Sequence, residues 1–259
     1  MRAKKSLGQN FLTDPNYRKK IIAAVLASNP QKILEIGPGR GSLTEGLIGL
    51  TEKFILIEKD KDLAGELRQR FSCEVINQDF LDVDLSQILG VPQKNITVVG
   101  NLPYNAASPI LARLMDNRRY FSEFFLMFQK EVALRLIAKP GTKDYSLITL
   151  LAQIDADCSI LFHVPPTAFR PRPKVTSSVV HFKLKPVPLV NDTEAPFFWK
   201  IVRLLFQQRR KTILSVLKGV EGMDKNHLEK HILPNARAEA YTVEELINLS
   251  RILSACPVV

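Results

Sequence analysis

The chain has 259 residues, of which 46% are hydrophobic and 24% charged, and its formal net charge is +10. This composition is typical of a globular protein and excludes a mainly disordered or fibrous chain. No apolar run reaches the roughly 18 residues of a spanning helix, and three cysteines without a CxxC pair favour a reducing, cytoplasmic compartment.

The positive charge is unevenly distributed along the chain. Residues 1–20 carry +5 and residues 164–218 carry +9, whereas 21–163 and 219–259 each carry −2. Two basic segments beside a nearly neutral body favour a polyanionic partner such as a nucleic acid. Solvated lysines on an ordinary surface are the alternative.

Short apolar runs alternate with helical patterns over the first two thirds of the chain, which predicts a largely parallel sheet covered by helices on both faces. The predicted strands are 32–36, 53–58, 73–77, 95–100 and 122–129, and the predicted helices are 61–72, 106–118 and 145–155. Two further β-rich runs, 157–164 and 174–184, are joined by a connection too short for a crossover helix. They are therefore expected to close the sheet as an antiparallel pair.

The C-terminal part has a different periodicity. Residues 185–196 are rich in proline and predict a linker, after which apolar residues recur at helical spacing. Thr242 precedes Glu245 by three residues, which is a capping-box pattern. We expect an α/β domain over residues 1–188 and a small all-α domain over residues 189–259.

A glycine-rich loop follows the first predicted strand, in the segment ILEIGPGRGSLT at 33–44. The turn after this strand lies where open α/β sheets bind ligands, and Ser42 is expected to cap a helix that runs to about Leu50. The glycine spacing is GxGxG rather than the dinucleotide pattern GxGxxG, which favours a ligand without a pyrophosphate. A purely structural turn remains the alternative.

Two acidic residues end or follow the next two strands. Glu58 can accept hydrogen bonds from both hydroxyls of a ribose, and Asp79 can accept one from the amino group of an adenine. Either acid alone could be a solvated residue at a strand end. Together they favour an adenosine-containing ligand.

The tetrapeptide Asn101-Leu102-Pro103-Tyr104 follows the fourth predicted strand, at the same edge of the sheet. The Asn101 side-chain oxygen and the Leu102 carbonyl could hold the hydrogens of an adenine N6 amine and direct its lone pair at an electrophile, while Tyr104 stacks on the base. Such catalysis works by positioning and electrostatics and needs no strong base. A tight turn without chemistry is the alternative.

Two cationic clusters could track phosphates. Phe169-Arg170-Pro171-Arg172-Pro173-Lys174 combines rigid prolines, three cations and an aromatic ring that can stack on an unpaired base. Arg209, Arg210 and Lys211 form the second cluster. Binding through such residues should weaken steeply as salt rises.

Taken together, these motifs resemble the S-adenosylmethionine-dependent rRNA adenine N6,N6-dimethyltransferases. The resemblance rests on the glycine loop from Glu35 to Thr44, on IEKD with Asp79, and on NLPY. It extends to KKSLGQNFL at 4–12 and FRPRPKVTSSVV at 169–180. The segment NARAEAYTVEEL at 235–246 resembles the C-terminal segment of the KsgA branch of the family. It implies a Rossmann-like methyltransferase sheet with a helical C-terminal domain that binds rRNA. The substrate it implies is a pair of adjacent adenosines in the 3′-terminal hairpin of small-subunit (16S) rRNA, modified during subunit biogenesis.

The resemblance also implies a role for individual residues. Asn101, Leu102 and Tyr104 would receive the target base, with Phe169 on its other face, and Arg170, Arg172, Lys174, Arg209, Arg210 and Lys211 would bind RNA. The residues expected to hold the cofactor S-adenosylmethionine are Gln9, Asn10, Leu12, Gly37, Gly39, Glu58, Lys59, Asp79, Phe80 and Asn101.

Three departures from the family pattern stand out: Arg40 in the glycine loop, Gln78 before Asp79, and NAAS at 105–108. The alternatives are a large-subunit methylase of the Erm type, a non-catalytic RNA-binding factor with this fold, and a nicotinamide dehydrogenase. We expect no metal, since the pair His227 and His231 lacks the glutamate of HExxH. We also expect a monomer.

Overall fold

The structure is a computed structural model, and it describes residues 4, 8–51, 53–219, 232–233 and 235–255. Its strands are β1 (Phe11–Leu12), β2 (Lys32–Ile36), β3 (Lys53–Glu58), β4 (Glu74–Asn77), β5 (Ile96–Asn101), β6 (Phe121–Gln129), β7 (Ala156–Val164), β8 (Phe169–Arg170) and β9 (Ser177–Leu184). Its α-helices are α1 (Pro15–Ala27), α2 (Thr44–Leu47), α3 (Lys61–Arg70), α4 (Leu85–Leu89), α5 (Ala107–Asp116), α6 (Lys130–Leu136), α7 (Leu147–Gln153), α8 (Ala195–Gln207), α9 (Ile213–Leu217) and α11 (Val243–Ser254).

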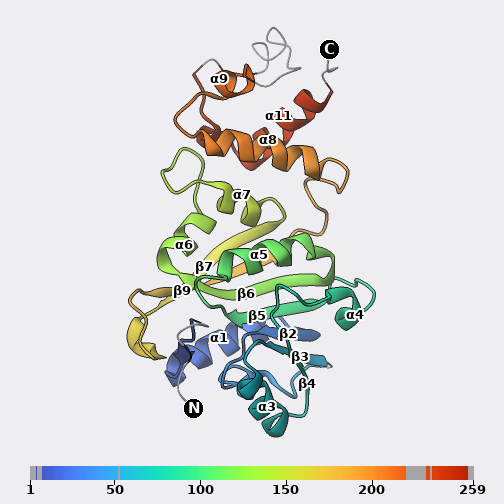
Figure 1. Ribbon diagram of the computed structural model, residues 1–259, viewed down its shortest axis with the longest axis vertical. Helices are drawn as coiled ribbons and strands as arrows, with labels where there is room; N and C mark the ends of the chain where they lie inside the picture. The colour runs from blue at the N-terminus through green and yellow to red at the C-terminus, as the bar shows by residue number, and fades with distance from the viewer. Residues whose placement is uncertain (1–3, 5–7, 52, 220–231, 234, 256–259) are drawn as a thin grey trace. The chain divides into compact units, whose positions relative to one another are not determined.

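Seven strands form one sheet in the order β4-β3-β2-β5-β6-β9-β7 (Figure 1). The neighbours from β4 to β6 pair in parallel, and β9 runs antiparallel to β6. The expected fold class, a mostly parallel sheet that ends in an antiparallel arrangement, is confirmed. The chain order reverses between β2 and β5, so the carboxyl ends of β2, β3 and β5 meet at the position where open sheets bind ligands.

Alternating strand residues explain why helices cover both faces of this sheet. Phe54 and Leu56 of β3 pack in one core with Ile21 and Val25 of α1. Their neighbours in sequence point to the opposite face, where α5 lies against the sheet (Figure 1). Both faces are therefore apolar, as the continuous hydrophobic runs of β3 and β5 predict.

A second, two-stranded sheet was not anticipated from the sequence. β1 pairs antiparallel with β8, so that Phe11 lies opposite Arg170 and Leu12 opposite Phe169. Two backbone bonds continue this contact, from Thr13 and Asp14 to the carbonyl of Ala168. The N-terminal segment is thereby joined to the proline-rich loop that lies about 155 residues later in the sequence.

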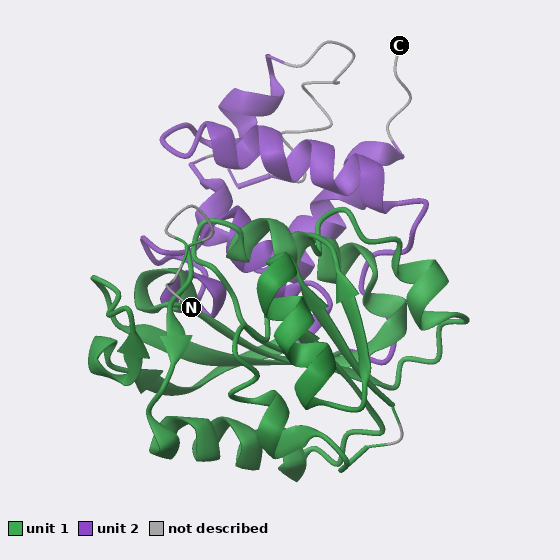
Figure 2. Cartoon of the chain, turned by 60° about the horizontal axis from the view of Figure 1, so that its bottom comes forward, with its two compact units in different colours: residues 1–133, 157–184 green, residues 134–156, 185–259 purple. Residues whose placement is uncertain are grey.

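The chain divides into two compact units (Figure 2). Unit 1 contains residues 1–133 and 157–184, and unit 2 contains residues 134–156 and 185–259. The division differs from the expected boundary after residue 188 because residues 134–156 and 185–188 belong to unit 2. Hydrophobic residues explain this assignment, since Leu150 of α7 packs in the same core as Phe198 and Val202 of α8.

Local signals at the helix ends were predicted with mixed success. The capping box of Thr242 and Glu245 is present at the start of α11. Ser42 does not cap a helix, because α2 begins at Thr44 after Leu43 and spans only four residues.

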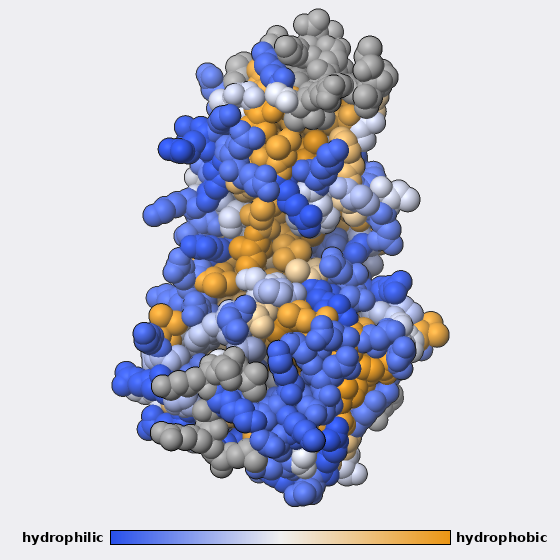
Figure 3. Space-filling model, viewed as in Figure 1, coloured by the Kyte–Doolittle hydropathy of each residue, from blue (hydrophilic) through white to orange (hydrophobic). Residues whose placement is uncertain are grey.

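On the face shown in Figure 3, hydrophilic residues cover much of unit 1, while hydrophobic residues gather over α8. No helix in the described part of the chain has the length and hydropathy that crossing a membrane requires.

Candidate active site

One pocket lies in unit 1 at the carboxyl ends of β2, β3 and β5. All residues expected to hold the cofactor line it, and so do Leu102 and Tyr104 of the NLPY segment: the cofactor set is Gln9, Asn10, Leu12, Gly37, Gly39, Glu58, Lys59, Asp79, Phe80 and Asn101. The structure thus brings together residues that are up to 95 positions apart in the chain. The carboxyl ends of parallel strands share one edge, which is the physical reason for this convergence.

The glycine loop lines the pocket with Gly37 and Gly39, and all three of its glycines, Gly41 included, lie in the left-handed backbone region. Gly37 has φ +64° and Gly39 has φ +59°, values that side chains disfavour. A Cβ on Gly39 would lie 3.0 Å from the Phe11 ring, whereas one on Gly37 would meet nothing within 4 Å. The loop therefore presents open space at Gly37 and close packing against β1 at Gly39. Arg40 places its guanidinium 5.0 Å from the centre of the Phe11 ring.

Glu58 is 6% exposed and is held by backbone groups. Its Oε2 accepts a hydrogen bond from the Gly39 N–H at 3.0 Å, and its Oε1 accepts one from the Asp60 N–H at 2.8 Å. Burial raises the pKa of Glu58, and these two bonds oppose the rise. Each carboxylate oxygen can accept a second bond, so the carboxylate is oriented to receive two donors of a ligand.

Glu35 is a second buried acid in the pocket wall, 2% exposed, for which the sequence suggested no individual role. Its Oε2 accepts a hydrogen bond from the Thr44 hydroxyl at 2.6 Å. Burial raises the pKa of Glu35 to about 7; the Thr44 bond opposes this rise and the charge of Glu58 adds to it. A fraction of Glu35 is therefore protonated at neutral pH, which reduces the repulsion between the two acids.

Asp79 lines the same pocket and forms an ion pair. Lys59 Nζ lies 2.6 Å from Asp79 Oδ2, and the Leu81 N–H donates to Oδ1. Burial would raise the pKa of Asp79, but the bond and charge of Lys59 outweigh that effect and hold it below its usual value. The carboxylate is thus kept ionised, so that both of its oxygens act as acceptors.

The NLPY segment follows β5 and faces the same pocket. The Asn101 side chain donates from Nδ2 to the Asn10 carbonyl at 2.9 Å, so its oxygen is the atom that can accept a bond from a ligand. The Tyr104 hydroxyl lies 2.6 Å from Ser177 Oγ, which fixes the ring. Burial raises the pKa of Tyr104, and the Ser177 bond opposes this rise. Ser177 was missed because one serine at the start of a strand carries no sequence signal.

Phe169, which the resemblance places on the other face of the target base, does not line the pocket in this structure. Its side chain is fully buried, with 0% exposure, and it belongs to the hydrophobic core with Leu12 and Val179. The residues described along the pocket do not include it. The physical reason is the pairing of β8 with β1, which directs Phe169 inward beneath the N-terminal segment.

The two basic clusters differ in their surroundings. Arg170, the last residue of β8, is exposed, and so are Arg172 and Lys174 on the loop that follows it. Arg210 and Lys211 are exposed in unit 2. Arg209 is engaged instead: it donates to Glu239 Oε2 at 2.9 Å and to the carbonyls of Lys143 and Tyr145 at 3.0 Å each. These contacts occupy Nε and Nη2 of Arg209, and its expected role in RNA binding stays a prediction.

The N-terminal segment is also basic, with Lys4 and Lys5. Lys4 forms ion pairs with Asp60 and Asp62 at 2.8 Å each rather than presenting a free cation. Lys5, like the pair His227 and His231, lies outside the described residues.

The pocket fits an adenosyl cofactor on structural grounds. The open space above Gly37 admits an approaching ligand, and Glu58 offers two oriented acceptors at the position expected for a ribose. Asp79 offers an ionised acceptor to an exocyclic amine. A sulfonium cofactor without a pyrophosphate requires no phosphate-binding helix, and α2 begins after the loop with only four residues.

Comparison with known proteins agrees with this chemistry. The family model of ribosomal RNA adenine dimethylase matches residues 1–255. A ribosomal RNA small subunit methyltransferase A from Chlorobium luteolum is 40% identical, covering 98% of this chain and 91% of its own. The protein of the same name from Halothermothrix orenii is 39% identical, covering 96% and 87%.

Solved structures agree with the fold. A dimethyladenosine transferase from Plasmodium falciparum superposes with a TM-score of 0.77 at 25% identity, covering 92% of this chain and 95% of that one. The 23S rRNA methyltransferase ErmE superposes with a TM-score of 0.70 at 24% identity, covering 95% and 100%, which supports the fold alone. With its glycine loop, strand-end acids and NLPY corner gathered around one pocket, the chain belongs to the ribosomal RNA adenine dimethylase family.

Proposed function

We propose that this protein uses S-adenosylmethionine to dimethylate N6 of two adjacent adenosines in the 3′-terminal hairpin of small-subunit rRNA. The observation that carries the proposal is the shared pocket of Glu58, Asp79, Asn101 and Tyr104. It joins acceptors for an adenosyl group to acceptors for a second adenine. S-adenosylmethionine supplies an electrophilic methyl group when bound.

The cofactor side of the proposal rests on the two strand-end acids. Glu58 would accept both ribose hydroxyls, because backbone bonds from Gly39 and Asp60 already orient its oxygens. Asp79 would accept the adenine amine, with Lys59 moving aside or sharing the oxygen it now contacts. Gln9 and Asn10 would cover the cofactor from the N-terminal segment, and Phe80, which is buried beside Asp79, would pack on it.

The substrate side rests on the NLPY corner. The Asn101 oxygen and the Leu102 carbonyl would accept the two hydrogens of N6, which directs the nitrogen lone pair toward the methyl group. Tyr104, fixed by Ser177, would stack on the base. Positioning of this kind lowers the barrier without a general base. The base must be unpaired or extruded to enter the pocket.

Phosphate contacts would come from exposed cations. In unit 1, Arg170 ends β8, and Arg172 and Lys174 lie on the loop after it. Arg210 and Lys211 lie in unit 2. Phe169 would reach a target base only if β8 separates from β1, because that pairing now buries its ring. We therefore assign base stacking to Tyr104 first.

The test is transfer of a labelled methyl group to undermethylated small and large ribosomal subunits, with the modified nucleotides mapped. We expect two dimethylated adenosines in the small subunit. Label in the large subunit instead would establish the Erm-type alternative. RNA binding without transfer would establish a non-catalytic factor, and calorimetric binding of NAD would favour a dehydrogenase.

A further inference from the structure

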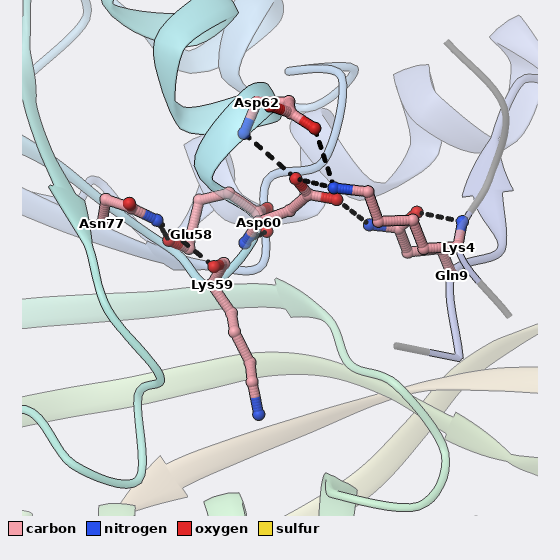
Figure 4. A network of polar contacts seen from close by, with 7 residues as sticks. All are labelled: Lys4, Gln9, Glu58, Lys59, Asp60, Asp62 and Asn77. Carbon is pink, nitrogen blue, oxygen red and sulfur yellow. Dashed lines mark hydrogen bonds and ion pairs between the residues drawn. The ribbon is translucent and has the colours of Figure 1, made fainter. Parts of the chain in front are cut away.

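A cluster of charged residues next to Glu58 is centred on Asp60, a residue to which the proposed chemistry gives no role (Figure 4). Asp60 follows β3 and precedes α3, and it is 3% exposed. Its Oδ1 accepts from Lys4 Nζ at 2.8 Å and from the Asp62 N–H at 3.1 Å, and its Oδ2 accepts from Gln9 Nε2 at 3.0 Å.

The same residue also holds Glu58. The Asp60 N–H donates to Glu58 Oε1 at 2.8 Å, so one residue is bonded to both the strand-end acid and the N-terminal segment. Glu58 and Gln9 both line the pocket, although they are 49 positions apart in the sequence. Any movement of Asp60 would therefore displace two walls of the pocket together.

A nearly buried carboxylate needs a compensating cation, and Lys4 supplies it. Burial would raise the pKa of Asp60, but the bonds from Lys4 and Gln9 outweigh this effect and hold it below its usual value. Lys4 also contacts Asp62 at 2.8 Å and donates from its backbone N–H to Gln9 Oε1 at 2.8 Å. Lys4 is thus bonded to Asp60 and to Gln9 at once.

We infer that Lys4 and Asp60 form an ionic clasp that positions Gln9 and Glu58 for the methyl donor, and that its loss weakens cofactor binding. Both are positioning residues, because neither Lys4 nor Asp60 is among the residues that the structure describes along the pocket. The inference rests on the proposed function, since it concerns the affinity for the same cofactor.

A simpler role for Asp60 is to cap α3, since its side chain accepts from the Asp62 N–H. That role needs no cation, so a substitution of Lys4 distinguishes the two explanations. Replacing Lys4 leaves the cap bond intact but removes the charge that holds the N-terminal segment to Asp60.

The experiment measures the affinity of the full chain for S-adenosylhomocysteine by calorimetry and KM and kcat for S-adenosylmethionine. The variants are Lys4→Met, Lys4→Arg, Asp60→Asn and the double variant Lys4→Met/Asp60→Asn. The matched control is Lys53→Met, which removes a lysine that lies 3.5 Å from Glu74. Lys53 begins β3, at the end of the strand opposite to Glu58. It makes the same change in charge and side-chain type away from the pocket.

We expect Lys4→Met to weaken binding about tenfold, the scale of a lost hydrogen bond to a charged group, and to raise KM more than it lowers kcat. Lys4→Arg should restore affinity to within about twofold of the parent chain, since an arginine keeps the charge. The double variant should bind no more weakly than Asp60→Asn, because the two residues act as one unit. Lys53→Met should bind like the parent chain.

Three results would overturn the clasp: unchanged affinity in Lys4→Met, an equal loss in Lys53→Met, or additive losses in the double variant. A fall in melting temperature without a change in affinity would reduce Asp60 to a helix cap. If the parent chain itself failed to bind either ligand, the proposed function would fail instead.

Discussion

The pocket of unit 1 and the basic cluster of unit 2 both hold charged side chains by hydrogen bonds, but the bonds have opposite consequences. In the pocket, backbone N–H groups orient the Glu58 carboxylate and leave each oxygen able to accept another bond. In unit 2, Arg209 directs its Nε and Nη2 donors to Glu239 and to two carbonyls. Hydrogen bonds within the protein therefore determine how many donors or acceptors of a charged side chain remain for a partner.

The largest effect on stability is expected at Phe169, which is either a core residue or part of a binding surface. Phe169→Ala should lower the free energy of unfolding by ~3–5 kcal/mol, because the ring is fully buried in the core of unit 1. Chemical denaturation measures it, with Phe162→Ala, a partly buried ring, as the milder control. An unchanged stability would return Phe169 to an exposed, base-stacking role.

Asn101→Ala tests whether the pocket performs the chemistry. Methyl transfer should fall by roughly ten- to a thousandfold, the scale of losing one positioned polar group, while affinity for S-adenosylhomocysteine changes much less. The control is Asn95→Ala, just before β5, which removes an amide that donates to Gln31 and Gln93. Equal turnover in the two variants would remove Asn101 from the mechanism.

Glu35→Gln tests the buried acid through pH. The pKa of about 7 in the folded chain exceeds the usual 4.5, so the folded state binds more protons and loses stability as pH rises between these values. The variant should be more stable than the parent at pH 8 by at most ~3 kcal/mol. The gain should shrink as pH falls and vanish below about pH 4.5; thermal unfolding across this range checks it, and a gain independent of pH would contradict the assignment.

Single substitutions in the second basic cluster separate structural from RNA-binding cations. Arg209→Ala should destabilise unit 2 by about 1–2 kcal/mol through its lost bonds. Arg210→Ala and Lys211→Ala should leave stability within about 0.5 kcal/mol and should each reduce the salt slope of rRNA binding by about one. Filter binding across a salt series measures this slope. A salt slope altered as much by Arg209→Ala, in a folded variant, would show that Arg209 contacts phosphate after all.

Much of the candidate site could be predicted because its residues follow strand ends. The predicted strand 32–36 is β2 and the predicted strand 53–58 is β3, and parallel strands place their carboxyl ends at one edge whatever the loops do. The β1–β8 pair and Ser177 could not be predicted in this way. Their contacts join segments that are about 70 to 155 residues apart, with no periodic pattern to signal them.

By itself, the sequence determined the alternation of strands and helices, the glycine loop and the acids after successive strands, because hydrophobic periodicity and turn residues act locally. Tertiary structure alone decided which charges remain available. Arg209 forms an ion pair with Glu239, and Lys4 forms one with Asp60. Tertiary structure also buries the Phe169 ring, in the strand that pairs with β1. The reason is physical: a side chain's exposure and partners depend on segments distant in the chain, which a local pattern does not contain.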